Sequence, residues 1–273
     1  MKKIICPTDF TSTANNAIEY AAKLAQKIGA EIELIHVQLL YVTESVSTLR
    51  ISKNVIAQTE HLQKIANEVT KTYGIKCSSK VELSDDEFEQ TIVDNSDDNN
   101  LIVIGSNGAD DIFEFIFGTN SYHLVKKAKC PVLIIPEGFQ FKEIKKMVFA
   151  WDYSDKNKLA FLQVKDFIDF FEPEIIFLHV GQNSIPNNGD VFESLKQEML
   201  SYLGEIQNIS FARVYLDDPE TYSERMDSYV TNTNSDLLAV TFYDRGFIRN
   251  LFHGNIVKGL TEITSYPLLV LHM

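Results

Sequence analysis

Two apolar runs decide the fold, Lys3–Asp9 (KIICPTD) and Met147–Asp152 (MVFAWD), and each of them ends at an aspartate. In both cases a histidine follows that aspartate by 27 positions, His36 after the first run and His179 after the second. The two histidines lie in matching apolar runs, so that the offset between the copies is 143. The sequence therefore indicates an internal repeat, which has to be recognised before a fold is assigned.

A second set of matches lies toward the end of each copy and has a constant offset of 136. The second copy is therefore seven residues shorter in its middle. We interpret the chain as a tandem duplication with domains at residues 1–140 and 141–273, because each part has the usual size of one domain. The matched pairs are Leu101–Ile104 with Leu237–Val240, Gly118 with Gly254, and Pro131–Ile135 with Pro267–Leu271.

Within each copy, short β-branched runs alternate with segments of helical periodicity. In the first copy, apolar residues recur at helical spacing from Ala14 to Ile28, and Gly29 supplies the stop. Ser84 with Glu87 fits a capping box for a short third helix. The strand-like runs are almost continuously apolar, as in parallel strands that are covered on both faces. The sequence thus predicts an α/β protein with two tandem doubly wound five-stranded parallel-sheet domains. The predicted strands of the first copy are Ile4–Thr8, Glu31–Val37, Ile75–Leu83, Leu101–Gly105 and Val132–Ile135.

The composition excludes several classes of partner. The chain has 273 residues, a formal charge of −13 and a pI near 4.9. This acidity disfavours nucleic acid, whose binding needs concentrated Lys and Arg, and it disfavours an anionic membrane surface. No run approaches the ~20 apolar residues of a membrane span, and the N-terminus does not resemble a secretory signal. We expect a cytoplasmic protein that binds neither nucleic acid nor membranes.

A ligand of such a sheet is expected beyond the carboxyl ends of its strands, where the strand order reverses. Asp9 follows the first strand, Val37 ends the second, and Gly105 and Gly108 follow Leu101–Ile104. Glycines at that place let main-chain N–H groups approach a ligand closely. Further along, the segment Gly118-Thr119-Asn120 opens a helix, whose free N–H groups and dipole favour phosphate.

The spacing Gly105-x2-Gly108-x9-Gly118-Thr119 resembles the G-2x-G-9x-G-[S/T] pattern of the universal stress protein family. The opening and closing segments, Pro7–Thr11 and Lys129–Pro136, are similar to that family too. The resemblance covers residues 1–137 and, more weakly, residues 146–273. It implies that the first domain binds ATP or a related adenine nucleotide, often with a divalent ion such as Mg²⁺.

The resemblance also implies a role for each matching position. In ATP-binding members, the acid at the position of Asp9 meets the adenosine moiety, and main-chain groups near Val37 contact the adenine. The positions that hold ribose and phosphates correspond here to Gly105, Gly108, Gly118, Thr119 and Asn120.

The residues themselves leave alternatives open. Asp110 and Asp111 follow the second glycine and would repel a triphosphate unless Mg²⁺ intervenes; they either ligate that ion or point to solvent. Asp9 either contacts a ligand, caps the first helix or does both. Gly105 and Gly108 form either a ligand-facing loop or a tight turn without a ligand.

The second copy lacks most of these features. Thr241 and Asp244 stand at the positions of the two loop glycines, and Trp151 places a large ring where a nucleotide would enter. We therefore expect no ATP binding by the second domain. Arg245, Arg249 and His253 either receive another anion, form a partner surface or are solvated.

No motif of an enzyme is evident: the chain lacks a P-loop, a nucleophile elbow and a metal-ligand spacing of histidines. We expect His36 and His179 to make structural hydrogen bonds. The sequence favours a regulatory nucleotide-binding protein of the stress response, with a weak ATPase or phosphotransferase and a ligand-free dimerising scaffold as alternatives. The resemblance also implies that Val132–Ile135 and Leu268–Leu271 pair as an intramolecular pseudo-dimer, and it leaves a homodimer and a protein partner open.

Overall fold

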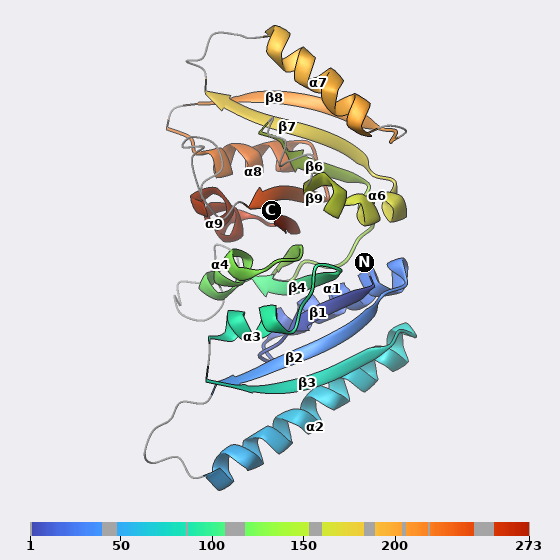
Figure 1. Cartoon of the computed structure of the whole chain (residues 1–273), viewed down its shortest axis with the longest axis vertical. Coiled ribbons are helices and arrows are strands. Elements are labelled where there is room, and N and C mark those ends of the chain that lie inside the picture. Colours follow the sequence, from blue (N-terminus) through green and yellow to red (C-terminus); the bar gives the residue numbers. More distant parts are fainter. Residues whose placement is uncertain are drawn as a thin grey trace. The chain divides into compact units, whose positions relative to one another are not determined.

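The computed structural model describes residues 2–39, 48–85, 87–106, 118–152, 160–182, 189–203, 206–217, 219–242 and 254–272. The chain divides into two compact units, unit 1 (Met1–Phe141) and unit 2 (Lys142–Met273) (Figure 1). Each unit is an α/β unit with a parallel sheet of five described strands, which confirms the predicted fold class.

Unit 1 has the strand order β3-β2-β1-β4-β5. α1 packs beside α2, and α3 packs beside α4. Because the crossovers to β2 and β3 run one way from β1 and those to β4 and β5 run the other way, the strand order reverses between β1 and β4. Its elements are β1 (Lys3–Pro7), α1 (Ser12–Ile28), β2 (Glu31–Leu39), α2 (Thr48–Tyr73), β3 (Cys77–Ser84), α3 (Phe88–Asp94), β4 (Asn100–Ser106), α4 (Gly118–Lys127) and β5 (Val132–Pro136).

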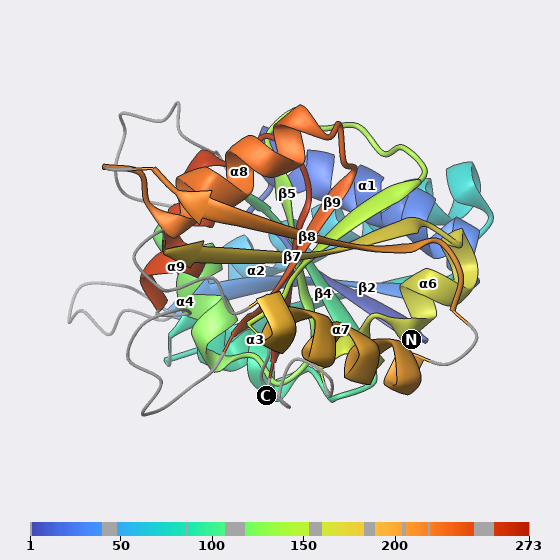
Figure 2. The same ribbon diagram turned by 90° about the horizontal axis from the view of Figure 1, so that it is seen from above.

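Unit 2 has the same strand order, which reads β8-β7-β6-β9-β10 in the direction used for unit 1. Figure 2 shows α7 and α8 on opposite sides of β7 and β8, as expected for a doubly wound sheet. Its elements are β6 (Lys146–Ala150), α6 (Lys165–Phe171), β7 (Glu174–Gln182), α7 (Gly189–Leu203), β8 (Ile209–Leu216), α8 (Tyr222–Asn232), β9 (Leu237–Phe242), α9 (Gly254–Ile263) and β10 (Leu268–His272).

Between the matched segments at His36 and Leu101 and their counterparts in unit 2, two helices differ in length. α2 has 26 residues whereas α7 has 15, and α3 has 7 whereas α8 has 11. The second copy therefore loses eleven residues in one helix and gains four in the next. The net difference of seven is the one that separates the offsets 143 and 136 in the sequence.

Helix α1 ends at the glycine that its sequence predicts and begins at a threonine cap. Thr11 is the N-cap and accepts a hydrogen bond from the Ala14 N–H at 3.2 Å. Gly29 ends the helix in the left-handed conformation with φ 71°, and its N–H donates to the Ala25 carbonyl. Alanines on the buried face let the helix lie close to the sheet.

The capping box predicted for α3 is wrong. Ser84 belongs to β3, and the N-cap of α3 is Glu87, which makes no side-chain capping bond. The Ser84 hydroxyl instead accepts a hydrogen bond from the Thr91 hydroxyl at 2.9 Å. The strand runs further than its apolar pattern suggested, so the serine lies too early to cap the helix.

Candidate functional site

Three of the predicted binding residues, Asp9, Val37 and Gly105, lie at the carboxyl edge of the unit 1 sheet. β1 lies between β2 and β4, and the connection from β1 to α1 starts where the strand order reverses. This connection consists of Thr8, Asp9, Phe10 and Thr11. Its geometry decides which groups can meet a ligand.

Asp9 does not cap α1 itself but holds the residue that does. Its Oδ1 atom accepts hydrogen bonds from the Thr11 N–H at 3.1 Å and from the Thr11 hydroxyl at 2.6 Å. The helix starts at Ser12, so the cap position falls on Thr11. Among the residues that the structure describes, the second oxygen of Asp9, Oδ2, has no hydrogen-bond partner. One carboxylate oxygen is thus fixed and the other remains available.

Phe10 adopts an unusual backbone conformation beside Asp9. Its φ is 70°, a value that residues other than glycine rarely adopt. Its ring lies 4.5 Å from the His36 ring and 4.9 Å from the His61 ring, measured between centroids. Its N–H donates to the Thr8 hydroxyl at 3.1 Å. These contacts hold the connection in one shape and offset the strain of the left-handed backbone.

His36 makes the structural hydrogen bond that the sequence suggested. Its Nδ1 lies 2.8 Å from the Thr8 carbonyl oxygen. Because a carbonyl oxygen can only accept, Nδ1 carries the hydrogen. The ring therefore ties the end of β2 to the end of β1.

Val37 lies where β2 has passed the end of β1. The register with β1 stops at Ile35, whereas Val37 still pairs with Glu82 of β3. The Ile35 carbonyl faces β1, because it accepts the Thr8 N–H at 2.9 Å. Two residues further, the main-chain groups of Val37 face the same side. They are thus directed past β1, toward the connection that carries Asp9.

Gly105 is needed for a reason that the sequence did not reveal. A Cβ atom at this position would lie 2.7 Å from Thr13 Cγ2 and 2.8 Å from the Thr13 carbonyl oxygen. The first turn of α1 therefore rests directly on β4, and no side chain fits between them. Close packing explains this glycine whether or not a ligand is bound.

The remaining predicted residues are only partly described. Gly118 opens α4, with Thr119 and Asn120 in its first turn, so the predicted helix start lies where the sequence placed it. This start carries main-chain N–H groups without an intrahelical partner and the positive end of the helix dipole. Gly108 and the acids Asp110 and Asp111 lie in residues 107–117, outside the described residues.

The same framework recurs in unit 2 with different chemistry. His179 Nδ1 lies 3.0 Å from the Trp151 carbonyl oxygen, as His36 does in unit 1. Burial, with a smaller contribution from the Arg213 charge, lowers the pKa of His179 to about 4. Gly254 opens α9, and Thr241 is buried in β9. Asp244, Arg245, Arg249 and His253 lie in residues 243–253, outside the described part of the chain.

Trp151 lies in the interior of unit 2 and not in an open site. Its side chain is 1% exposed and packs against the rings of Phe177, Phe192 and Phe211. The expected position of this ring is therefore corrected: the backbone of β6 directs it into the space between the sheet and α7. Thr8, the residue at the corresponding position of unit 1, leaves that volume to smaller groups.

Two kinds of feature are absent from the described residues. In the ranges that the structure covers, no group of three or more His, Cys, Asp or Glu side chains could hold a metal ion. Within the same ranges, no helix has the length and apolar character needed to cross a membrane.

Sequence reasoning missed Thr11, Thr13 and Phe10. A threonine directly before a helical pattern is a signal that could have identified Thr11. Thr13 and Phe10 carry no such signal, because they contact residues that are distant in the sequence. Thr13 lies against β4, and Phe10 lies against β2 and α2.

Comparisons with known proteins agree with this architecture. Residues 1–136 match the model of the universal stress protein family. A universal stress protein from Archaeoglobus fulgidus DSM 4304 has 18% identity and a TM-score of 0.77, with 98% of this chain and 97% of that chain covered. A universal stress protein described as putative, from Pseudomonas aeruginosa UCBPP-PA14, has 13% identity and a TM-score of 0.62, with 100% and 93% covered. No curated protein matches the chain in sequence.

Proposed function

Because the chain belongs to the universal stress protein family through residues 1–136, we propose that unit 1 binds ATP or a related adenine nucleotide. In this proposal the protein is a cytoplasmic binding protein of the stress response, and the nucleotide, with or without Mg²⁺, changes its interaction with a partner. Unit 2 binds no ATP.

The observation that carries the proposal is the arrangement of Asp9. Thr11 orients the carboxylate through Oδ1, while Oδ2 has no partner in the described part of the chain. The Val37 main chain is directed toward the same connection and offers a donor and an acceptor to the edge of a base. A carboxylate and a main-chain edge of this kind suit an adenosine moiety.

A second group of residues would bind the phosphates. Main-chain N–H groups of Gly118, Thr119 and Asn120 open α4 and favour an anion. Gly105 keeps the end of β4 free of a side chain next to α1, and Gly108 belongs to the same proposed site. A divalent ion would add positive charge beside the phosphates.

The substitution Asp9→Asn tests this role of Asp9 apart from its role in the helix start. An amide oxygen still accepts the two hydrogen bonds from Thr11, so the free energy of unfolding should stay within about 0.5 kcal/mol of the parent. Loss of the charge should weaken ATP binding about tenfold or more, measured by isothermal titration calorimetry. Unchanged affinity would exclude Asp9 from the site.

Two experiments distinguish the alternatives. Denaturing the purified chain and identifying any released nucleotide by mass spectrometry separates a binding protein from a ligand-free scaffold. Single-turnover assays with Mg-ATP separate a binding protein, which returns intact ATP, from an ATPase or phosphotransferase, which returns ADP within one turnover.

A further inference from the structure

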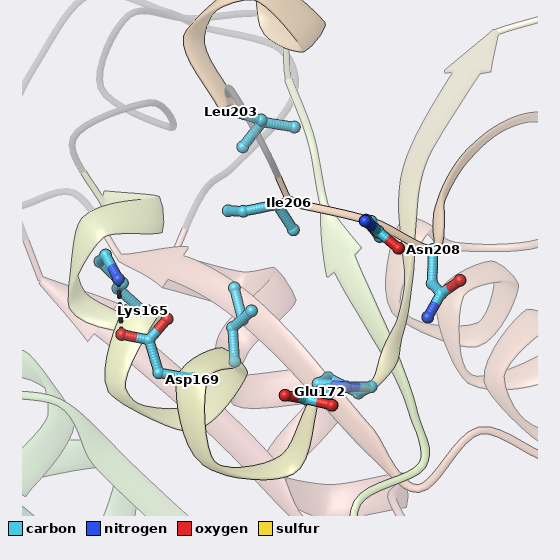
Figure 3. Close-up of a pocket in the computed structure, with 9 residues that line it drawn as sticks. Lys165, Asp169, Glu172, Leu203, Ile206 and Asn208 are labelled. Atoms are coloured by element: carbon cyan, nitrogen blue, oxygen red, sulfur yellow. Dashed lines mark hydrogen bonds and ion pairs between the residues drawn. The ribbon is translucent and has the colours of Figure 1, made fainter.

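Unit 2 contains a cavity of about 790 Å³ between the end of α6 and the end of α7, shown in Figure 3. It lies where β7 and β8 begin, so it occupies the amino edge of the sheet. The proposed nucleotide site uses the carboxyl edge of unit 1, and no residue of this cavity belongs to it. We call it the α6–α7 cavity, and its lining residues are Lys165, Ile168, Asp169, Glu172, Pro173, Leu203, Ile206, Gln207 and Asn208.

The cavity has an apolar floor and a polar rim. Ile168 and Leu203 are 6% and 7% exposed and form the floor, together with Pro173 and the half-buried Ile206. Figure 3 shows Leu203 and Ile206 facing the same open space as the acidic side chains. The volume lies in the range of sites for small organic ligands.

The charges at the rim do not cancel. Lys165 Nζ lies 2.5 Å from Asp169 Oδ2, so these two neutralise each other. Among the described residues, the Glu172 carboxylate has no ion-pair or hydrogen-bond partner, although it lines the same space. The rim therefore has one uncompensated negative charge.

The helix ends add to this negative potential. α6 and α7 both end at the cavity, and neither has a basic residue in its last turn. The corresponding helices of unit 1, α1 and α2, end with Lys27 and Lys71. Because the carboxyl end of a helix is the negative end of its dipole, a cation is favoured there. Unit 1 supplies that cation from its own chain, and unit 2 does not.

Glu172 has a backbone conformation that usually requires glycine. Glu172 ends α6 in the left-handed conformation, with φ 44° and ψ 47°. The matching residue of unit 1 is Gly29, which suits that conformation, and a following proline disfavours it further in unit 2. The carboxylate thus occupies a position where the backbone favours glycine.

We propose that the α6–α7 cavity binds a small amphipathic cation. The ammonium group of such an amine lies at the Glu172 carboxylate. Its apolar body covers Ile168, Leu203 and Ile206. Two carboxylates against one lysine, together with two helix ends that have no basic residue in the last turn, disfavour an anion of the same size.

The proposal is tested by titrating the full chain with 2-phenylethylamine and, separately, with the neutral analogue 2-phenylethanol, followed by ¹H–¹⁵N NMR. The amine should bind about tenfold more tightly than the alcohol, and the shifts should cluster at Ile168, Glu172, Leu203 and Ile206. Equal affinity for both compounds, or shifts centred elsewhere, would overturn it.

Glu172→Gly is the decisive variant, because it removes the carboxylate and relieves the backbone, so that the fold is kept. Its affinity for the amine should fall to that of the alcohol, whereas Glu172→Asp should retain the preference. Glu193→Gln, an exposed carboxylate of α7 outside the cavity, is the matched control and should bind like the parent. Unchanged amine binding by Glu172→Gly would contradict the proposal. ATP binding by unit 1 should be the same in the parent and in the three variants. A loss of amine binding is therefore distinguishable from a loss of nucleotide binding.

Discussion

Asp9, Thr11 and Thr8 share the task of shaping the start of α1. Thr11 satisfies the Ala14 N–H, Asp9 orients Thr11, and Thr8 receives the Phe10 N–H and the His36 ring. Three of these bonds join residues two or three positions apart, and the bond from His36 ties them to β2. Together they fix the direction of the Asp9 carboxylate. Preorganisation of this kind lowers the entropic cost of binding a ligand.

Gly105→Ala should destabilise unit 1. The added methyl group would lie 2.8 Å from the Thr13 carbonyl oxygen, which belongs to the backbone and cannot rotate away. We expect a loss of about 1–3 kcal/mol in the free energy of unfolding, measured by chemical denaturation.

Gly181→Ala is the matched control for that variant. The nearest atom to its added Cβ, Tyr215 Cδ1, lies at an ordinary contact distance of 3.5 Å. This variant should stay within about 0.5 kcal/mol of the parent. Equal effects of the two substitutions would show that close approach of α1 is not the reason for Gly105.

His179 should make unit 2 sensitive to acid. Its pKa is about 4 in the folded chain, against an ordinary value of 6.5, so the unfolded chain takes up the proton first as the pH falls. Stability is therefore lost between pH 6.5 and pH 4, by roughly 2–3 kcal/mol at pH 4.5. Denaturation curves at pH 7 and 4.5 should show a smaller loss for His179→Gln than for the parent. A loss of the same size in both chains would refute this role of His179.

At the scale of elements, the two copies have the same strand registers but helices of different length. α7 is shorter than α2, and α8 is longer than α3, while the strands keep their registers. Cys6, Leu34 and Ser79 form one cross-strand row in unit 1. The corresponding row of unit 2 is Phe149, Phe177 and Phe211. The larger rings fill the space between the sheet and the shorter α7.

The ends of α1 and α6 provide a matched pair of substitutions. Glu172→Gly should stabilise unit 2 by about 1 kcal/mol, because glycine adopts the left-handed conformation without a steric penalty. Gly29→Ala should destabilise unit 1 by a similar amount for the converse reason. Thermal and chemical denaturation measure both. A destabilised Glu172→Gly chain would mean that contacts of the glutamate outweigh its backbone strain.

The elements themselves could largely be predicted from the sequence. Apolar periodicity and the stop at Gly29 located α1, and the two offsets located the repeat. The start of α3 could not be predicted, because β3 extends to Ser84 through pairing with β2 rather than through its own apolar pattern. The direction of the Trp151 ring also depends on its partners, since Phe192 and Phe211 come from distant parts of the chain.

At the scale of the whole molecule, the duplication has produced two units with one topology and different sites. Unit 1 keeps a carboxylate, an open strand edge and a helix start at its carboxyl edge. Unit 2 keeps the histidine bond and the helix start, but buries an indole in its core and opens a cavity at the other edge. The sequence predicted a nucleotide site at the carboxyl edge of unit 1. It held no sign of the α6–α7 cavity, because that cavity depends on how two helix ends pack.

The central claim is that unit 1 binds ATP and unit 2 does not. The most direct measurement is a calorimetric titration of the full chain with Mg-ATP, compared with Gly118→Val and Gly254→Val, which alter the equivalent starts of α4 and α9. We predict one ATP per chain, an affinity at least about tenfold weaker in Gly118→Val because a branched side chain would crowd the phosphates, and parent-like binding in Gly254→Val. Two ATP per chain, parent-like binding by Gly118→Val, or loss of binding in Gly254→Val would contradict the account.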